Sequence, residues 1–271
     1  MDVQKARTRL GIPRDSFVVC SFGLITSRKD GQKLVSAWAE SELGQQPGAM
    51  LLFVGQSIDR YGEALLARIA RHQGKSHIAV TGHVTQAVYQ DHLAACDAAV
   101  QLRSLSRGET SAAILDCFAA GVPVVANAHG TTNEIPDNAL IKISDVFTTI
   151  ELAGALDCLH NDEALRRQVG EHGRSYLTEV HGSGKVGAAF HAAIERFATN
   201  SPAATRRKLI ARVGELAATV APSEDDLRRF AFAIARNAAR IGLRQLLCDV
   251  TVLAEQDART GIQRVVRSVF M

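Results

Sequence analysis

The sequence has few features of secreted or membrane proteins. Its five cysteines are odd in number and scattered, and no two form a C-x-x-C pair, which favours reduced core thiols over a disulfide framework or a metal site. No apolar run approaches the roughly 20 residues of a bilayer span. The charged start, MDVQKAR, is not a signal peptide. We therefore expect a soluble, cytoplasmic protein without a metal centre.

Two common enzyme fingerprints are also missing. No G-x-G-x-x-G follows a predicted strand, which disfavours an NAD-dependent dehydrogenase, and the absence of G-x-S-x-G disfavours an α/β hydrolase. The segment GSGK at 182–185 looks like the end of a phosphate-binding P-loop. However, Glu179 occupies the position of the earlier glycine and no strand precedes it. We interpret this segment as structural.

The composition is that of a globular protein. The 271 residues are 46% hydrophobic and 22% charged and include 21 glycines, which excludes disorder, collagen and low complexity. Residues 1–201 carry 19 basic and 21 acidic side chains, whereas residues 202–271 carry 12 and 7, so the net charge of +3 comes from the tail. Because these charges follow amphipathic helical patterns, we expect a solvated helix face, open to peripheral membrane contact, and no nucleic-acid binding.

Six short apolar runs alternate with segments of helical periodicity. Runs that are apolar on both faces indicate strands buried on both sides, and alternation with helices calls for right-handed crossovers. The predicted fold is α/β, a doubly wound parallel sheet of Rossmann-like type, with its ligand crevice beyond the carboxyl ends of the strands. The predicted strands are 17–22, 50–54, 78–81, 97–102, 122–126 and 139–143.

The pattern becomes wholly helical from about residue 148 and breaks at 199–202. After the break, 246–250 reads as a new strand, and the helical pattern that follows it stops at Met271. A helix interrupted in mid-pattern indicates a fragment of a longer polypeptide. The expected organisation is a ligand-binding domain at 1–199, a helical linker at 200–243 with helices at 205–219 and 224–241, and the start of a further α/β unit at 244–271.

The segment RGETSAAILDCFAAGVPVVA at 107–126 is the most informative. It reads as a turn, a helix capped by Thr110 or Ser111 and ended by Gly121, and a buried strand. A helix N-terminus at the carboxyl end of a strand offers free N–H groups and a positive dipole end to a phosphate. Glu109 and Asp116 flank it, and carboxylates accept hydrogen bonds from sugar hydroxyls. The combination fits a nucleotide sugar.

Both carboxylates have a plainer interpretation as well. Glu109 can act as a helix N-terminal charge. Asp116 lies on a largely apolar helix, where a carboxylate needs either a partner or access to a cleft.

This run resembles the signature of the group 1 glycosyltransferases, which are retaining enzymes of the GT-B fold. The signature has a Glu, seven residues, a second Glu and an Ala-rich helix leading to Gly-x-Pro-Val, here GVPV at 121–124. Asp116 falls at the second Glu, which implies a contact with the donor ribose. Gly108 falls at the first, with Glu109 one residue later beside the sugar. The resemblance also implies that the donor diphosphate is bound at Thr110, Ser111 and Ala112.

A second match covers the beginning of the chain. The segments LGIP at 10–13, GLITSRK at 23–29 and SAW at 36–38 resemble the opening of the nucleotide-binding domain of that family. Lys29 matches the lysine that binds the donor phosphate, and Gly23 is the glycine before it. The arginine that commonly follows this glycine is Leu24 here, which leaves Arg28 as the candidate for the second positive charge.

Weaker matches extend the resemblance to about residues 5–199. His83 follows the third predicted strand, where the family packs the nucleobase, and Glu134 lies in a turn similar to the family's Gly-Gly-x-x-Glu. His83 also fits an ordinary loop histidine, and Glu134 a turn cap. The acceptor-binding half of a GT-B enzyme is expected outside this chain. Residues 246–267 resemble the start of another such half, which implies tandem modules.

The resemblance implies a retaining hexosyltransferase of bacterial surface-polysaccharide synthesis. The donor would be GDP-mannose and the acceptor a glycan or lipid-linked glycan, with no cofactor and no obligatory metal. Lys29 and Glu109 are the catalytic candidates, because Lys29, Arg28 and the amides after Glu109 would stabilise the departing diphosphate. Two alternatives stay open. One is a degenerate spacer module, since Leu24 and Gly108 replace charged residues of the family, and the other is a GT-B sugar-nucleotide epimerase.

Overall fold

The computed structural model describes residues 2–57, 60–72, 76–106 and 108–237. The chain forms two compact units, Met1–Gly182 and a second unit that begins at Ser183. No helix in the described part of the chain is both long and apolar enough to cross a membrane. The strand expected at 246–250 and the unit expected at 244–271 lie outside the described residues, and the end of the functional domain near residue 199 stays a prediction.

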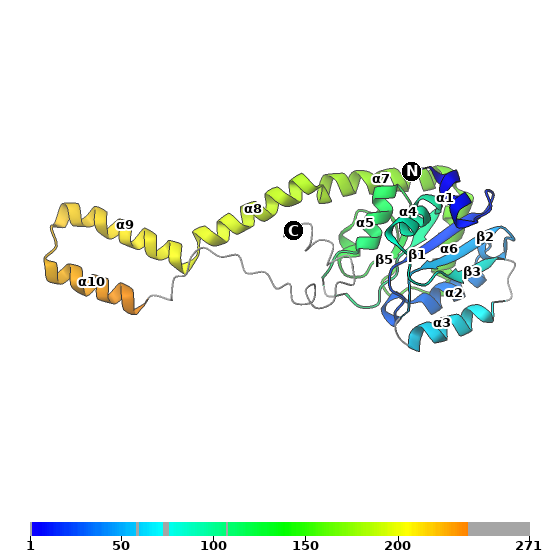
Figure 1. Ribbon diagram of the computed structural model, residues 1–271, viewed down its shortest axis with the longest axis horizontal. Coiled ribbons are helices and arrows are strands. Elements are labelled where there is room, and N and C mark those ends of the chain that lie inside the picture. Colours follow the sequence, from blue (N-terminus) through cyan, green and yellow to red (C-terminus); the bar gives the residue numbers. More distant parts are fainter. Residues whose placement is uncertain (1, 58–59, 73–75, 107, 238–271) are drawn as a thin grey trace. The chain divides into compact units, whose positions relative to one another are not determined.

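Six strands form one parallel sheet in the first unit (Figure 1). The order β3-β2-β1-β4-β5-β6 places β1 next to β4, so the direction of winding reverses between these two strands. This is the doubly wound Rossmann-like topology predicted from the alternating pattern. The strands are β1 (Phe17–Phe22), β2 (Ala49–Val54), β3 (His77–Val80), β4 (Ala98–Val100), β5 (Val124–Asn127) and β6 (Ile141–Ile143), each within or beside a predicted run.

Helices cover both faces of the sheet, and each face has its own apolar core. Strand β1 serves both cores, because Val19 packs with Trp38 and Leu156 whereas Val18 and Phe22 pack on the other face. The helices of this unit are α1 (Val3–Leu10), α2 (Gly31–Glu40), α3 (Arg60–Ala70), α4 (Gln86–Ala95), α5 (Ala112–Ala120), α6 (Thr149–Asn161) and α7 (Glu163–His181), with 3-10 turns η1 (Ser27–Lys29), η2 (Leu43–Gln45) and η3 (Gly130–Glu134).

Glycines fix helix α5 against helix α7. Gly121 ends α5 in the left-handed conformation with φ at 73°, as its position in the sequence predicted. A Cβ on Gly170 of α7 would lie only 2.3 Å from the carbonyl oxygen of Gly121, and one on Gly173 would lie 2.6 Å from the Phe118 ring. The close packing that these glycines permit determines where the N-terminus of α5 points.

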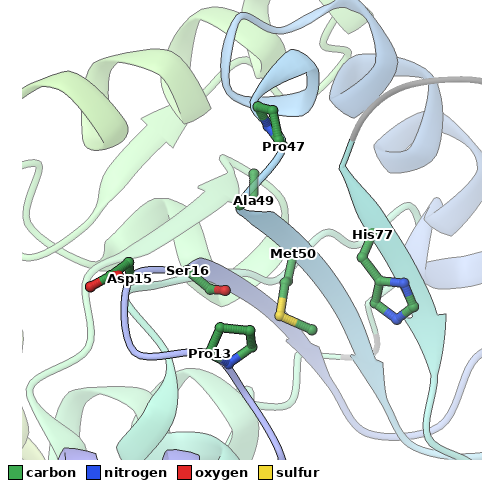
Figure 2. Close-up of a pocket in the computed structure, with 8 residues that line it drawn as sticks. Pro13, Asp15, Ser16, Pro47, Ala49, Met50 and His77 are labelled. Atoms are coloured by element: carbon green, nitrogen blue, oxygen red, sulfur yellow. The ribbon is translucent and has the colours of Figure 1, made fainter.

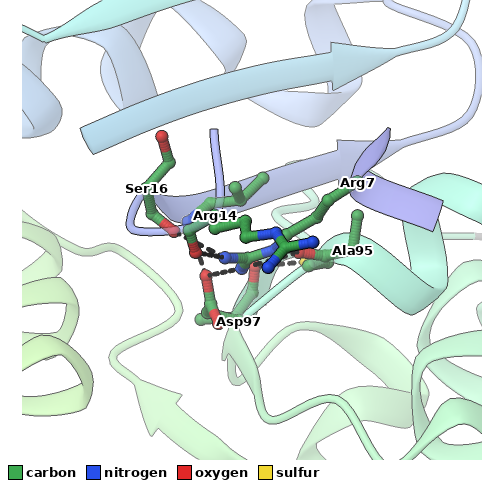
Figure 3. Close-up of polar contacts among 8 residues, drawn as sticks. Arg7, Arg14, Ser16, Ala95 and Asp97 are labelled. Atoms are coloured by element: carbon green, nitrogen blue, oxygen red, sulfur yellow. Dashed lines mark hydrogen bonds and ion pairs between the residues drawn. The ribbon is translucent and has the colours of Figure 1, made fainter. Parts of the chain in front are cut away.

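A buried arginine ties α1 to the sheet (Figure 3). Arg7 is 5% exposed, and its guanidinium donates to the carbonyl groups of Ala95, Arg14 and Ser16 and pairs with Asp97 at 2.7 Å. Asp97 also accepts the N–H of Val18 at 2.8 Å. Because every contact is charge-assisted, the network fixes α1, the start of β1 and the end of α4 to one another.

The described part of the second unit, residues 183–237, is helical. Its elements are α8 (Ser183–Thr199), α9 (Pro202–Val220) and α10 (Glu224–Arg236), which confirms the helices expected there up to Arg236. Ser201 caps α9, and Ser223 and Asp226 form a reciprocal capping box at α10. The GSGK segment falls where α7 ends and α8 begins, with no strand before it.

The cysteines in the described residues are all free thiols. Cys20 and Cys117 are buried, as expected for core thiols, and their burial raises the pKa of both thiols well above the ordinary value. Cys158 differs from the expectation, because it is exposed on α6.

Candidate functional site

Three loops meet at the carboxyl ends of β1, β4 and β5. The N–H of Ser104 donates to the carbonyl of Arg28 at 2.9 Å, which joins the loop after β4 to the loop after β1. The hydroxyl of Thr131 donates to the carbonyl of Glu109 at 3.1 Å, which joins η3 to the same loop. Because winding reverses between β1 and β4, these loops surround the switch point at which doubly wound sheets bind ligands.

Lys29 reaches this switch point from η1. Its ammonium donates to the carbonyl of Phe22, the last residue of β1. Gly23 has φ at 95°, a backbone conformation that favours glycine, and a Cβ there would lie 2.7 Å from Lys29 Nζ and displace the ammonium. Burial, and then the charge of Arg103, lowers the pKa of Lys29 from 10.5 to about 8. Lys29 is therefore a poorly solvated cation at the carboxyl end of β1.

Arg103 is a second cation at the site, and it belongs to none of the motifs that predicted the site. Its guanidinium pairs with Glu109 at 2.5 Å, with 21% of the Arg103 side chain and 44% of the Glu109 side chain exposed. Its position directly after the predicted strand 97–102 could have indicated a site residue, because ligands bind beyond the carboxyl ends of the strands. The expected second cation, Arg28, is exposed and meets the neighbouring loop through its carbonyl group.

Asn127 holds the backbone of Arg103 from both sides. The Asn127 amide nitrogen donates to the carbonyl of Arg103 at 2.7 Å, and its oxygen accepts the N–H of Arg103 at 2.8 Å. Asn127 is 1% exposed, and its amide also contacts Asp145, which bonds His129 Nδ1 at 2.8 Å. Since a buried amide with several partners is rigid, the position of Arg103 is fixed before any ligand arrives.

The loop before α5 explains the unusual position of the acidic residue in the signature. Gly108 has φ at 89°, a left-handed conformation that side chains with a Cβ rarely adopt. A glycine therefore suits this position, and the carboxylate follows on Glu109.

Ser111 is the N-cap residue of α5, and Ala112 is the first residue of the helix. Ser111 is 6% exposed and its side chain makes no capping hydrogen bond to the helix, whereas Thr110 and Ala112 are exposed. The N-cap is therefore Ser111, one of the two cap residues that the sequence predicted. The helix opens at the same sheet edge as Lys29, with its positive dipole end directed there.

Asp116 has the partner that a part-buried carboxylate needs. The hydroxyl of Tyr89 on α4 donates to Asp116 Oδ2 at 2.9 Å. The same Tyr89 ring packs edge-on against Phe22 at 5.2 Å between centroids, so it links α5 to the end of β1. The ribose contact of Asp116 stays a prediction.

The remaining predicted residues lie on loops at the same edge. His83 follows β3 and is exposed, and Glu134 ends η3 and is exposed. Burial and then the charge of Glu134 raise the pKa of Tyr176 on α7. Within the described residues, no cluster of three or more His, Cys, Asp or Glu side chains is arranged to hold a metal ion.

A depression of about 430 Å³ lies at the amino ends of the strands, opposite the switch-point loops (Figure 2). Its walls come from the amino ends of β1, β2 and β3, and they include Pro13, Pro47, Met50 and His77. Ligands of doubly wound sheets bind at the other end of the strands. We therefore place the functional site at the switch point and not in this depression.

Comparison with known families agrees with this geometry. Residues 2–176 match the family model described as glycosyl transferases group 1. This chain belongs to that family. The match begins before Lys29 and ends beyond Glu134, so it includes every switch-point loop described above.

Relatives and solved structures support the same assignment. The serotype-specific mannosyltransferase WbdA of Escherichia coli is 26% identical over 98% of this chain, which spans 32% of the relative's length. HepE of Anabaena, solved with UDP and glucose, superposes with a TM-score of 0.60 at 19% identity over 70% of this chain and 52% of its own. The C-terminal domain of the group 1 protein LpcC of Francisella tularensis gives 0.57 at 18% identity over 67% and 94%. At these identities the superpositions establish the Rossmann-like α/β fold alone.

Proposed function

We propose that this chain forms the donor-binding part of a retaining glycosyltransferase that uses a nucleoside-diphosphate sugar. The observation that carries the proposal is the ammonium of Lys29 at the switch point, held against Phe22 and Gly23. The N-terminus of α5 opens at the same edge. A part-buried cation and a helix N-terminus together suit a diphosphate, because both stabilise negative charge in a poorly solvated place.

The proposed chemistry is stabilisation of a leaving group. As the sugar departs, negative charge builds on the diphosphate, and contacts that strengthen with that charge lower the barrier. Lys29 and the amides of Ser111 and Ala112 would supply those contacts from the chain itself, with no cofactor and no obligatory metal. Further roles would be sugar-hydroxyl binding by Glu109, ribose binding by Asp116, and donor contacts by Gly23, Arg28, His83, Thr110 and Glu134.

We further propose GDP-mannose as the donor. The support is the likeness to a mannosyltransferase over nearly the whole chain. The acceptor would be a glycan or lipid-linked glycan in cytoplasmic polysaccharide synthesis, bound by parts of a longer polypeptide. Since this chain spans about a third of that relative, donor binding is the activity to test first.

Calorimetric titration with GDP, UDP and ADP, and then with the matching nucleotide sugars, tests the proposal. We expect selective binding of one nucleotide. The variant Lys29→Ala should weaken it by about 1 to 3 kcal/mol, the scale of a charge-assisted contact. Lys5→Ala is the matched control, because Lys5 is an exposed lysine on α1. Wild-type affinity in Lys29→Ala would remove Lys29 from the site.

A spacer module is the second candidate. It is favoured by Leu24, an exposed apolar residue (41%) where the family commonly has arginine, and by Gly108 in place of an acidic residue. A folded sample that binds none of the nucleotides, both alone and within the full-length protein, would support the spacer.

A further inference from the structure

Hydrogen bonds hold the backbone of Arg103 at the switch point. Its peptide group is held by Asn127 through two hydrogen bonds, and the next residue, Ser104, bonds the carbonyl of Arg28, the neighbour of Lys29. The Arg103 backbone therefore runs beside the segment that carries Lys29. Its side chain then turns toward the loop that opens α5, where it meets Glu109.

The pair between Arg103 and Glu109 joins two groups of the proposed donor site. The Arg103 guanidinium is mostly shielded and the Glu109 carboxylate is almost half exposed. An ion pair with such an exposed partner is weak, because water solvates the carboxylate well when it leaves. A diphosphate that arrives at Lys29 can therefore compete with Glu109 for the guanidinium, and the planar fork of arginine suits phosphate oxygens.

We propose that Arg103 is a second diphosphate-binding residue and that donor binding exchanges its partner. The guanidinium passes from the Glu109 carboxylate to the diphosphate, and Glu109 turns to the hydroxyls of the donor sugar. This inference rests on the proposed function. It supplies the second positive charge that Leu24 cannot, and it couples recognition of the diphosphate to recognition of the sugar.

The test is a titration of wild type, Arg103→Ala, Glu109→Gln and the double variant with the nucleoside diphosphate that wild type binds. Arg103→Ala should weaken binding about 10- to 100-fold, since it removes a charge-assisted contact. Glu109→Gln should tighten binding about two- to fivefold by removing the competing anion. In the Arg103→Ala background, Glu109→Gln should change nothing, because the competition no longer exists.

The nucleotide sugar gives a second readout. Glu109→Gln should lose the preference for nucleotide sugar over nucleotide, since the amide cannot replace a carboxylate that accepts two hydroxyl hydrogen bonds. A merely structural Glu109 would leave that preference unchanged. Arg103→Lys distinguishes loss of the cation from misfolding of Arg103→Ala. It keeps the positive charge and should retain part of the affinity.

The matched control is the ion pair of Arg9 and Asp91, which joins α1 to α4 away from the switch point. Arg9→Ala and Asp91→Asn should leave every affinity unchanged. Wild-type affinity in a folded Arg103→Ala would overturn the inference while leaving the proposed function intact. Equal tightening by Glu109→Gln with and without Arg103 would also overturn it. A wild type that binds no nucleotide would overturn both proposals.

Discussion

The lowered pKa of Lys29 predicts that donor affinity falls as the pH rises above neutrality. The ligand selects the protonated ammonium, and the pKa of this group is lowered to about 8 by burial and by the charge of Arg103. A lysine with an ordinary pKa of 10.5 would stay charged throughout this range. The site should therefore lose affinity at a pH that leaves exposed lysines unaffected.

The size of the effect follows from the titration of one group. With a pKa of about 8, about nine-tenths of Lys29 is protonated at pH 7 and about one-tenth at pH 9. The apparent Kd should thus rise about tenfold between these two values, or about 1.4 kcal/mol. With an unperturbed pKa the same change of pH would alter the Kd by less than about 5%.

Calorimetric titration of wild type and Lys29→Arg between pH 7 and pH 9 isolates this group. The arginine stays charged, so the variant reports every other pH effect, including titration of the nucleotide base. Lysine Cε chemical shifts, assigned by comparison with Lys29→Arg, measure the Lys29 pKa without any ligand. An unchanged ratio of the two affinities across the range, or a Lys29 midpoint above pH 10, would refute the reasoning.

Three further changes should have distinct outcomes. Arg7→Met should lower the free energy of unfolding in urea by about 3 kcal/mol, because Asp97 and three carbonyl groups lose a buried cation; a loss below 1 kcal/mol would contradict this. Gly23→Ala should weaken nucleotide binding in the same calorimetric titration, since a φ of 95° strains alanine and a Cβ 2.7 Å from Lys29 Nζ would displace the ammonium. Gln101 Nε2 has no hydrogen-bond partner in the described part of the chain, so Gln101→Met should raise the thermal midpoint, and a fall would show that the amide has a partner.

Much of the fold was predictable because the central strands β1, β2, β4 and β5 are buried on both faces. Such strands must be apolar at nearly every position, and this makes short continuous runs that stand out from helical periodicity. The runs 17–22 and 50–54 matched β1 and β2 to within one residue. The start of α10 after Ser223 was equally readable, because capping depends on residues three apart in the sequence. Helix α9 begins at Pro202 and not near residue 205 as predicted, because Ser201 caps it.

The site was predictable only where its residues belong to a sequence motif. Lys29 and the N-terminus of α5 follow glycines and strands at fixed spacing, so the sequence by itself determined that a lysine and a helix N-terminus would lie at the carboxyl ends of the strands. Arg103 and Asn127 are 24 residues apart, and Tyr89 and Asp116 are 27 apart, with no spacing that connects them. Only the pairing of β4 with β5 and the packing around β1 bring these groups together, because hydrogen bonds between distant loops depend on strand order, which local periodicity does not encode.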